Sequence, residues 1–297
     1  MKKNIQIAEK SKIWFAFSLI LITISIGSLF INGLNFGIDF IGGTIVTIEL
    51  HTPFETSDAK ALIDEFDSSA DVTYAGDAKT QVIISTKDDL SSEERQALFD
   101  KFQEKYNLEN SDLLSIDTVS PSIGAEMTNS AMIAAIVAVL LMLLYITFRF
   151  EFMFGLTAVV ALVHDLIIVL GVYSVFQIQV NSPLIAALLT ILGYSINDTI
   201  VVFDRIRENR LKFGKYDYAA LIDTSVSQTL RRSINTSFTT LLAIGSLYVF
   251  GVPAVQDFAL PLMVGIISGT YSSIFIASAL WCKIKEFQFS KKTAVKN

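Results

Sequence analysis

The sequence predicts a polytopic α-helical membrane protein, with six membrane spans and one small α+β domain inserted after the first span. Of the 297 residues, 52% are hydrophobic and 18% are charged, whereas charged residues make up about 25% of a soluble domain. Six apolar stretches approach or exceed the length of about 20 helical residues that a bilayer core requires. A polar segment with alternating strand and helix patterns separates the first two stretches.

The six predicted spans contain two Asp residues and one His residue, but no Lys, Arg or Glu. They cover residues 13–31, 131–148, 152–176, 183–203, 234–250 and 258–282. The first span is longer than a signal-peptide core of about 7–15 residues, and no clear Ala-x-Ala cleavage site follows it. We therefore expect this span to be a membrane anchor.

Basic residues predict which ends of the spans face the cytoplasm. Four segments hold 17 of the 23 Lys and Arg residues, namely residues 1–12, 149–151, 204–233 and 283–297. The short loops of residues 177–182 and 251–257 hold none. Because cytoplasmic loops carry an excess of Lys and Arg, we expect both termini in the cytoplasm. Residues 283–297 form the cytoplasmic tail, and its part from Ser290 onward is expected to be disordered.

Residues 32–130 then form an extracytoplasmic domain. Strands are expected at residues 44–50, 72–74, 81–86 and 114–119, and a helix at residues 56–66. Ser91 and Glu94 form a capping-box pattern at the start of a second helix, which continues to Tyr106. The order βαββαβ is typical of a ferredoxin-like, split-βαβ domain. No catalytic cluster stands out within it, so we expect no enzymatic activity.

Composition excludes several other classes of function. The net charge of −6 argues against a generally basic nucleic-acid-binding protein. Cys282 is the only cysteine, which excludes an internal disulfide and a thiolate metal cluster. The chain contains no phosphate-binding loop for ATP. We therefore expect no cofactor and no metal, and no nucleic-acid partner.

Asp198 lies inside the fourth predicted span, six residues before Asp204 and about 9 Å from the cytoplasmic boundary. Tyr194 and Ser195 precede it by about one helical turn and Asn197 is adjacent, so the surroundings are polar. Ionisable residues in a bilayer are costly and are functional candidates by default. The residue is expected to bind and release protons; alternatively, it fixes helix packing.

Arg232 begins a polar face of the fifth span. Asn235, Thr236, Thr239 and Thr240 follow at helical spacing. Such a face must contact protein or water rather than lipid. Arg232 is either a counter-ion for Asp198 or a cytoplasmic flanking residue like Arg231 beside it.

Two further features have two interpretations each, and a third feature carries little weight. His164 and Asp165 lie in the third span, about 100° apart on the helix, and form either part of a proton path or a buried polar pair. Asp39 is either catalytic or, as we favour, a turn residue before the first strand. Gly265 and Gly269 form a GxxxG pattern that predicts close helix packing only.

Four motifs resemble those of the SecF family, accessory membrane subunits of bacterial protein export within the superfamily of RND transporters. They lie at residues 35–44, 163–165, 193–209 and 229–240, and the likeness covers nearly the whole chain. The resemblance implies an RND-like half with six spans. It also implies proton-relay roles for Asp198 and Arg232, but it assigns no role to His164 and Asp165. We expect a set of polar residues to support the relay: His164, Asp165, Ser195, Asn197, Asn235, Thr236 and Thr239.

The resemblance further implies a function and its partners. A separate SecD would complete a twelve-span unit in the bacterial plasma membrane, and the proton would be the coupling ion. The unit would draw an unfolded exported polypeptide outward after SecA has pushed it into the SecYEG channel, with YajC as an additional partner. The alternatives are an RND-type half-transporter for small molecules and a purely structural subunit.

Overall fold

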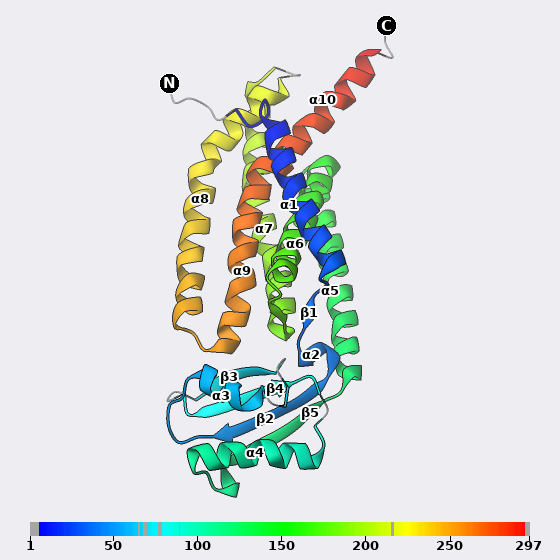
Figure 1. The fold of residues 1–297 in the computed structure, drawn as a ribbon. Helices are drawn as coiled ribbons and strands as arrows, with labels where there is room; N and C mark the ends of the chain where they lie inside the picture. Colours follow the sequence, from blue (N-terminus) through cyan, green and yellow to red (C-terminus); the bar gives the residue numbers. More distant parts are fainter. Residues whose placement is uncertain are drawn as a thin grey trace.

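The computed structural model describes residues 6–64, 66–67, 70–76, 79–88, 90–214 and 217–294, and combines a bundle of long helices with a small α+β domain (Figure 1). Within these residues, six helices are long and apolar enough to cross a membrane. They are α1 (Ser11–Ile31), α5 (Pro121–Arg149), α6 (Phe152–Val175), α7 (Ser182–Asn209), α8 (Tyr218–Phe250) and a last span made of α9 (Pro253–Tyr271) and α10 (Ser278–Ala294). The prediction of a polytopic helical membrane protein is thereby confirmed.

Three of the spans form the centre of the bundle. In the most apolar part of each span, 50% of the residues of α6, 44% of α7 and 61% of the last span are buried. The corresponding fractions are 11% for α1, 6% for α5 and 11% for α8. The outer helices therefore present apolar surface to lipid or to another protein, while α6, α7 and α9 can enclose polar groups.

Helices α5, α7, α8 and α10 extend beyond the predicted spans. Helix α8 begins at Tyr218 rather than at residue 234, and Asp217 caps its first turn by accepting a hydrogen bond from the backbone N–H of Ala220. Helix α10 continues to Ala294, so the expected disorder from Ser290 is wrong for residues 290–294. An ion pair between Lys283 and Glu286, at i and i+3, supports this last helix beyond the apolar stretch.

The α+β domain contains a four-stranded antiparallel sheet in the order β3-β4-β2-β5. Its strands are β2 (Gly43–Glu49), β3 (Asp71–Ala75), β4 (Gln81–Thr86) and β5 (Leu113–Val119), and its helices are α3 (Thr56–Ile63) and α4 (Ser92–Tyr106). The elements follow one another as βαββαβ. Val46 and Ile84 from the sheet share one core with Ile63 of α3 and Phe102 of α4. The predicted capping box of Ser91 and Glu94 is confirmed at the start of α4.

Short elements link the domain to the bundle. After α1 come β1 (Asn35–Phe36) and the single turn α2 (Ile38–Ile41), and β6 (Gln179–Val180) precedes α7. Strands β1 and β6 pair in parallel. Two 3₁₀ turns, Asn110–Asp112 and Arg210–Lys212, complete the regular structure within the described residues. The domain lies at one end of the bundle, and both ends of the chain lie at the other (Figure 1).

Candidate functional site

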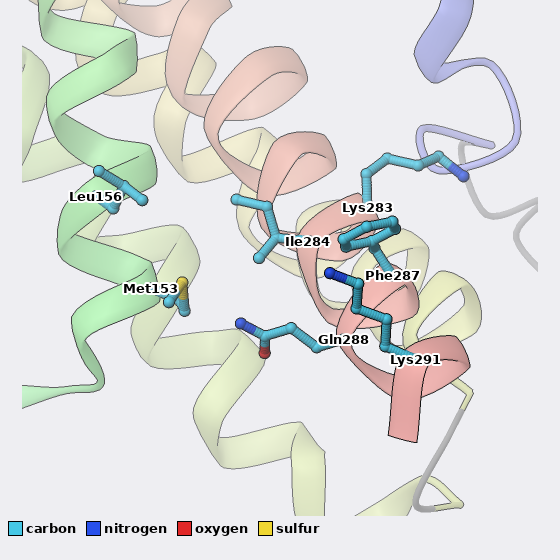
Figure 2. Close-up of a pocket in the computed structure, with 7 residues that line it drawn as sticks. All are labelled: Met153, Leu156, Lys283, Ile284, Phe287, Gln288 and Lys291. Carbon is cyan, nitrogen blue, oxygen red and sulfur yellow. The ribbon is translucent and has the colours of Figure 1, made fainter. Parts of the chain in front are cut away.

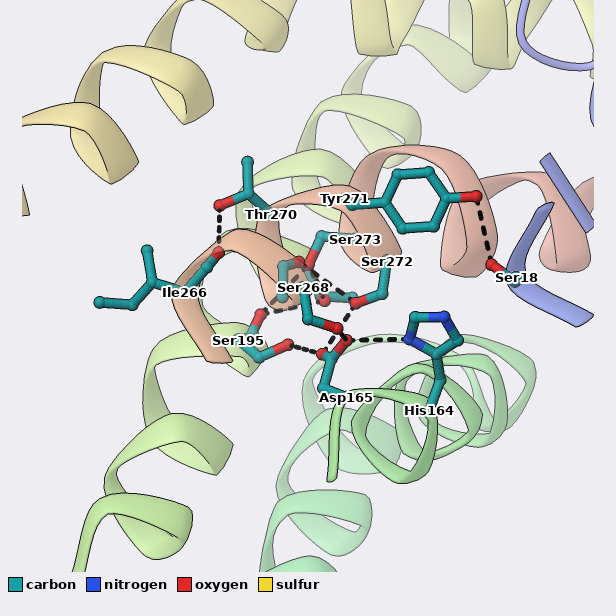
Figure 3. Close-up of polar contacts among 12 residues, drawn as sticks. Ser18, His164, Asp165, Ser195, Ile266, Ser268, Thr270, Tyr271, Ser272 and Ser273 are labelled. Atoms are coloured by element: carbon teal, nitrogen blue, oxygen red, sulfur yellow. Dashed lines mark hydrogen bonds and ion pairs between the residues drawn. The ribbon is translucent and has the colours of Figure 1, made fainter. Parts of the chain in front are cut away.

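A carboxylate at the centre of the bundle is held by hydroxyl groups from neighbouring helices. Asp165 of α6 is fully buried. Its Oδ2 accepts hydrogen bonds from Ser195 Oγ of α7 at 2.7 Å and Ser272 Oγ at 2.8 Å, and its Oδ1 accepts one from Ser268 Oγ of α9 at 2.7 Å (Figure 3). These four residues form what we call the serine cage. The cage ties α6, α7 and the last span together in the middle of the membrane region.

His164 also contacts Asp165, with 3.0 Å between Nδ1 and Oδ1 (Figure 3). The two residues therefore form a buried polar pair, one of the two interpretations of the sequence, because flexible side chains overcome the about 100° between their Cα positions. Nε2 of His164 is buried and has no hydrogen-bond partner among the described residues. The ring lies 6.0 Å from that of Tyr271, whose hydroxyl donates to Trp14 O of α1 at 2.9 Å.

Small side chains and a change of helix type bring the last span close to α7. A Cβ atom on Gly265 would collide with Ile191, and one on Gly269 would crowd Ser195, so the glycines permit the close packing that the GxxxG pattern predicts. A π-helical turn, Ser272–Ala277, follows α9. Such turns are often found at functional sites. Here the turn begins at Ser272, a member of the serine cage.

Asp198 lies one turn farther along α7 and has a different environment. Its side chain is 7% exposed, and Oδ2 has no hydrogen-bond partner among the described residues. Ser233 and Arg232 of α8 are its nearest interacting side chains, but the Ser233 hydroxyl makes no hydrogen bond of standard geometry. Arg232 lies close enough for electrostatic attraction, and within the described residues no salt bridge joins the two groups.

The polar residues of α8 divide between two faces of that helix. Ser233 and Ser237, which the sequence did not single out, are buried, and Ser237 hydrogen-bonds Thr270 of α9 at 2.5 Å. The predicted site residues are exposed in the single chain: Arg232, Asn235, Thr236 and Thr239 on α8, and Asn197 on α7. Among the described residues, the side chains of the polar stripe formed by Asn235, Thr236 and Thr239 have no hydrogen-bond partner on another element, since the two threonines donate to backbone carbonyls of α8 itself.

The serine cage shows what the sequence did not reveal. Ser268 and Ser272 were visible only as small residues near the GxxxG pattern, and nothing local indicates that their hydroxyls meet Asp165, 103 or more residues earlier. Asp39 lies in the single turn α2, as the favoured interpretation expected, and its carboxylate also accepts hydrogen bonds from Ser182 at the start of α7, which the sequence did not indicate.

Glu151 lies in the link between α5 and α6. It anchors the end of the bundle that lies opposite to Asp39 and the start of α7. Its carboxylate binds Lys285 of α10 at 2.7 Å and also Arg210 after α7. Burial alone would raise the pKa of Glu151, but hydrogen bonds from these two cations outweigh burial and hold the pKa below its ordinary value. This ion-pair cluster, the Glu151 clasp, stays charged at neutral pH.

A groove lies between α6 and α10 near the Glu151 clasp (Figure 2). Apolar side chains line its interior and two lysines lie along α10; the lining residues are Met153, Leu156, Lys283, Ile284, Phe287, Gln288 and Lys291. None of these residues belongs to the serine cage or contacts Asp198. Among the described residues, no group of three or more His, Cys, Asp or Glu side chains is placed to hold a metal ion.

Comparisons with known proteins identify the family. Residues 99–287 match the model of "Protein export membrane protein SecD/SecF, C-terminal", and residues 27–53 match that of the "SecD/SecF GG Motif". The chain is 37% identical to protein translocase subunit SecF of Sebaldella termitidis over 292 residues, covering 96% of this chain and 93% of that protein. It is 39% identical to the SecF of Vibrio alginolyticus over 285 residues, covering 95% and 90%.

Longer relatives match as well. SecDF of Thermus thermophilus is 40% identical over 270 residues, which span 89% of this chain and 36% of that protein. A crystal structure of SecDF from the same genus and species, described as a translocon-associated membrane protein, has a TM-score of 0.79 and 38% identity and covers 96% of this chain. This chain spans only 39% of the solved one. The resemblance seen in the sequence is thereby confirmed, and the half-transporter for small molecules is not favoured. The chain belongs to the SecD/SecF family of protein export membrane proteins.

Proposed function

We propose that this chain is a proton-coupled, non-enzymatic accessory of protein export that works together with a SecD partner. Its relatives are protein translocase subunits, so an accessory role in protein export is established by family. Coupling to protons is the step that we add. The observation that supports it is Asp198, a carboxylate in the membrane region with an oxygen that has no partner among the described residues, opposite Arg232 and Ser233.

Asp198 and Arg232 can form a two-state contact between α7 and α8. When the carboxylate is ionised, the Arg232 guanidinium attracts it; when it is protonated, this attraction disappears. A potential of 100 mV supplies about 2.3 kcal/mol for each charge that crosses the membrane. That energy biases a conformational equilibrium by about fiftyfold, which is enough to shift α7 against α8.

The partners and the orientation follow the family. Fusion of SecD and SecF in the SecDF relatives supports a SecD half that pairs with this one. The unpartnered polar stripe of α8 is a surface that such a half can cover. We further propose that the ferredoxin-like domain faces outward from a bacterial plasma membrane and that both termini lie in the cytoplasm. SecYEG, SecA, YajC and the emerging polypeptide would then be the partners in translocation.

The test is export driven by a proton gradient in vesicles that carry Asp198→Asn. The amide keeps the size of the carboxyl group but cannot exchange a proton, so we expect the stimulation by the gradient to be lost while ATP-driven export remains. Thr190→Ala, on the exposed surface of the same helix, is the matched control. Full stimulation by the gradient in the Asp198→Asn vesicles, at equal protein levels, would refute the proton role.

A further inference from the structure

The segment of residues 35–43 joins the first span to the external sheet, and it also contacts α7. Strand β1 pairs with β6 immediately before α7 begins. The backbone N–H of Gly37 continues this pairing by donating to Val180 O at 2.9 Å. A Cβ atom on Gly37 would collide with the side chain of Asn181, so the two segments touch closely.

Asp39 closes this contact with its side chain. Its Oδ2 accepts hydrogen bonds from the backbone N–H of Ser182 at 2.8 Å and from the Ser182 hydroxyl at 2.6 Å. Ser182 is the first residue of α7, where free N–H groups and the helix dipole favour a negative charge. The residue at the usual capping position, Asn181, makes no capping hydrogen bond. Asp39 therefore supplies the N-terminal cap of α7 from a distant part of the chain.

The same segment is fastened to the external sheet. Gly43 begins β2, the strand that pairs with both β4 and β5. Lys87, directly after β4, donates from Nζ to Asn35 Oδ1 at 2.8 Å. Neither Gly43 nor Gly124 has room for a side chain. A Cβ atom on Gly43 would collide with the backbone carbonyl of Thr86, and one on Gly124 would collide with that of Phe40. The segment is thus held between α7, α5 and the sheet.

We propose that Asp39 is a positioning residue that couples α7 to the external domain during proton-driven movement. The inference rests on the proposed function, because it takes proton exchange at Asp198 as the source of movement. Asp198 lies sixteen residues after Ser182, about 24 Å along the same helix. When α7 shifts or tilts, its first residue, Ser182, moves and displaces Asp39. The close contacts of residues 35–43 then transmit this displacement to β2.

Two labelling positions can follow the two ends of this linkage. Leu211, just after α7, is 94% exposed, and Glu104 lies on the exposed surface of α4 in the domain. The native Cys282 is buried, so Leu211→Cys or Glu104→Cys provides one reactive thiol for an environment-sensitive fluorophore. The experiment uses the full chain in complex with its SecD partner in vesicles, and it records fluorescence after a pH step.

Without further substitution, we expect both labels to respond to the pH step. With Asp39→Ala, we expect the response at residue 104 to be lost and that at residue 211 to persist. Asp39→Asn should restore the response at residue 104, because one amide oxygen can accept both hydrogen bonds from Ser182. Glu151→Ala is the matched control: it breaks a clasp of similar size at the other end of the bundle, and it should leave the response at residue 104 intact.

Three results would overturn the inference. The first is an undiminished response at residue 104 in Asp39→Ala. The second is loss of both responses in Asp39→Ala and in Asp39→Asn alike, since a purely structural residue would behave in that way. In these two cases Asp198→Asn still removes both responses, so the proposed function stands. If Asp198→Asn leaves both responses unchanged, the proton role fails and the inference fails with it.

Discussion

Asp165 and Asp198 are both carboxylates in the membrane region, yet they are held in opposite ways. Asp165 is fully buried and receives hydrogen bonds from three serines in addition to its contact with His164. Asp198 has an oxygen without a partner among the described residues and faces the outer helix α8. A carboxylate whose two oxygens both accept hydrogen bonds from other helices holds these helices in one arrangement. A carboxylate with an oxygen that lacks a partner has fewer hydrogen bonds to lose when it binds a proton.

The largest expected effect that tests this difference is on stability. Asp165→Ala removes the carboxylate that accepts from three buried serine hydroxyls and contacts His164. Hydrogen bonds between membrane helices contribute about 0.6 kcal/mol each, so the three serine contacts predict a loss of about 2 kcal/mol in the free energy of unfolding. Reversible unfolding in mixed micelles measures it. Asp198→Ala should cost clearly less, and an equal or larger cost would invalidate the distinction.

Arg232 should matter for function more than for stability. Arg232→Gln removes the attraction toward ionised Asp198, and because Arg232 is exposed in the single chain, we expect an effect of at most about 1 kcal/mol, or about fivefold, on gradient-driven export. Arg232→Lys keeps the charge and should retain most of the activity. Rates of gradient-driven export in vesicles give the comparison. Equal losses in the two variants would show that the shape of the guanidinium, rather than its charge, is required.

Ser195 connects the two carboxylates, since it lies on α7 one turn before Asp198 and donates to Asp165. Ser195→Ala should lower stability by about 0.6 kcal/mol, the average for one such hydrogen bond, and leave gradient-driven export unchanged. Unfolding and export assays on the same preparation test both parts. If gradient-driven export falls as far as in Asp198→Asn, Asp165 and Asp198 work as one unit, and the assignment of different roles to them is wrong.

The smallest effect concerns a third carboxylate, in the α+β domain. Asp112 hydrogen-bonds His51 at 2.8 Å, and this contact raises the pKa of His51, while the pKa of Asp112 is lowered by a backbone hydrogen bond with Glu109 and by His51. The stabilisation from His51 is therefore complete below its unfolded pKa and is lost as the pH rises through the higher folded pKa.

A titration by NMR can measure this pair in the full chain, because His51 and His164 are the only histidines and His51→Gln assigns their signals. We expect the pKa of His51 to lie above the ordinary histidine value of about 6.5, and Asp112→Asn to move it back toward that value. A midpoint that Asp112→Asn does not change would show that the pair has no energetic role in solution.

The sequence predicted most of the architecture because apolar length and alternation are local signals. It singled out Asp198 as a candidate for the same reason, since an ionisable residue inside an apolar stretch is visible without any neighbour. Arg232 lies just before the fifth predicted span and was singled out by the polar face that follows it. The serine cage could not be predicted, because Ser195, Ser268 and Ser272 come from different helices and meet Asp165 only after packing. The contact of Asp39 with Ser182 was not predicted on similar grounds, since Ser182 is 143 residues away.

The π-helical turn in the last span determines the directions in which the side chains after it point around the helix axis. One extra residue in a turn rotates the subsequent helix by about 100° relative to an uninterrupted α-helix. Before the turn, Ser268 points at Asp165; after it, Trp281 stacks on Phe154 of α6 with ring centroids 4.7 Å apart. Removal of one residue from Ser272–Ala277 would therefore rotate Trp281 by about 100° about the helix axis and displace it from Phe154, while Ser268 before the turn would keep its direction.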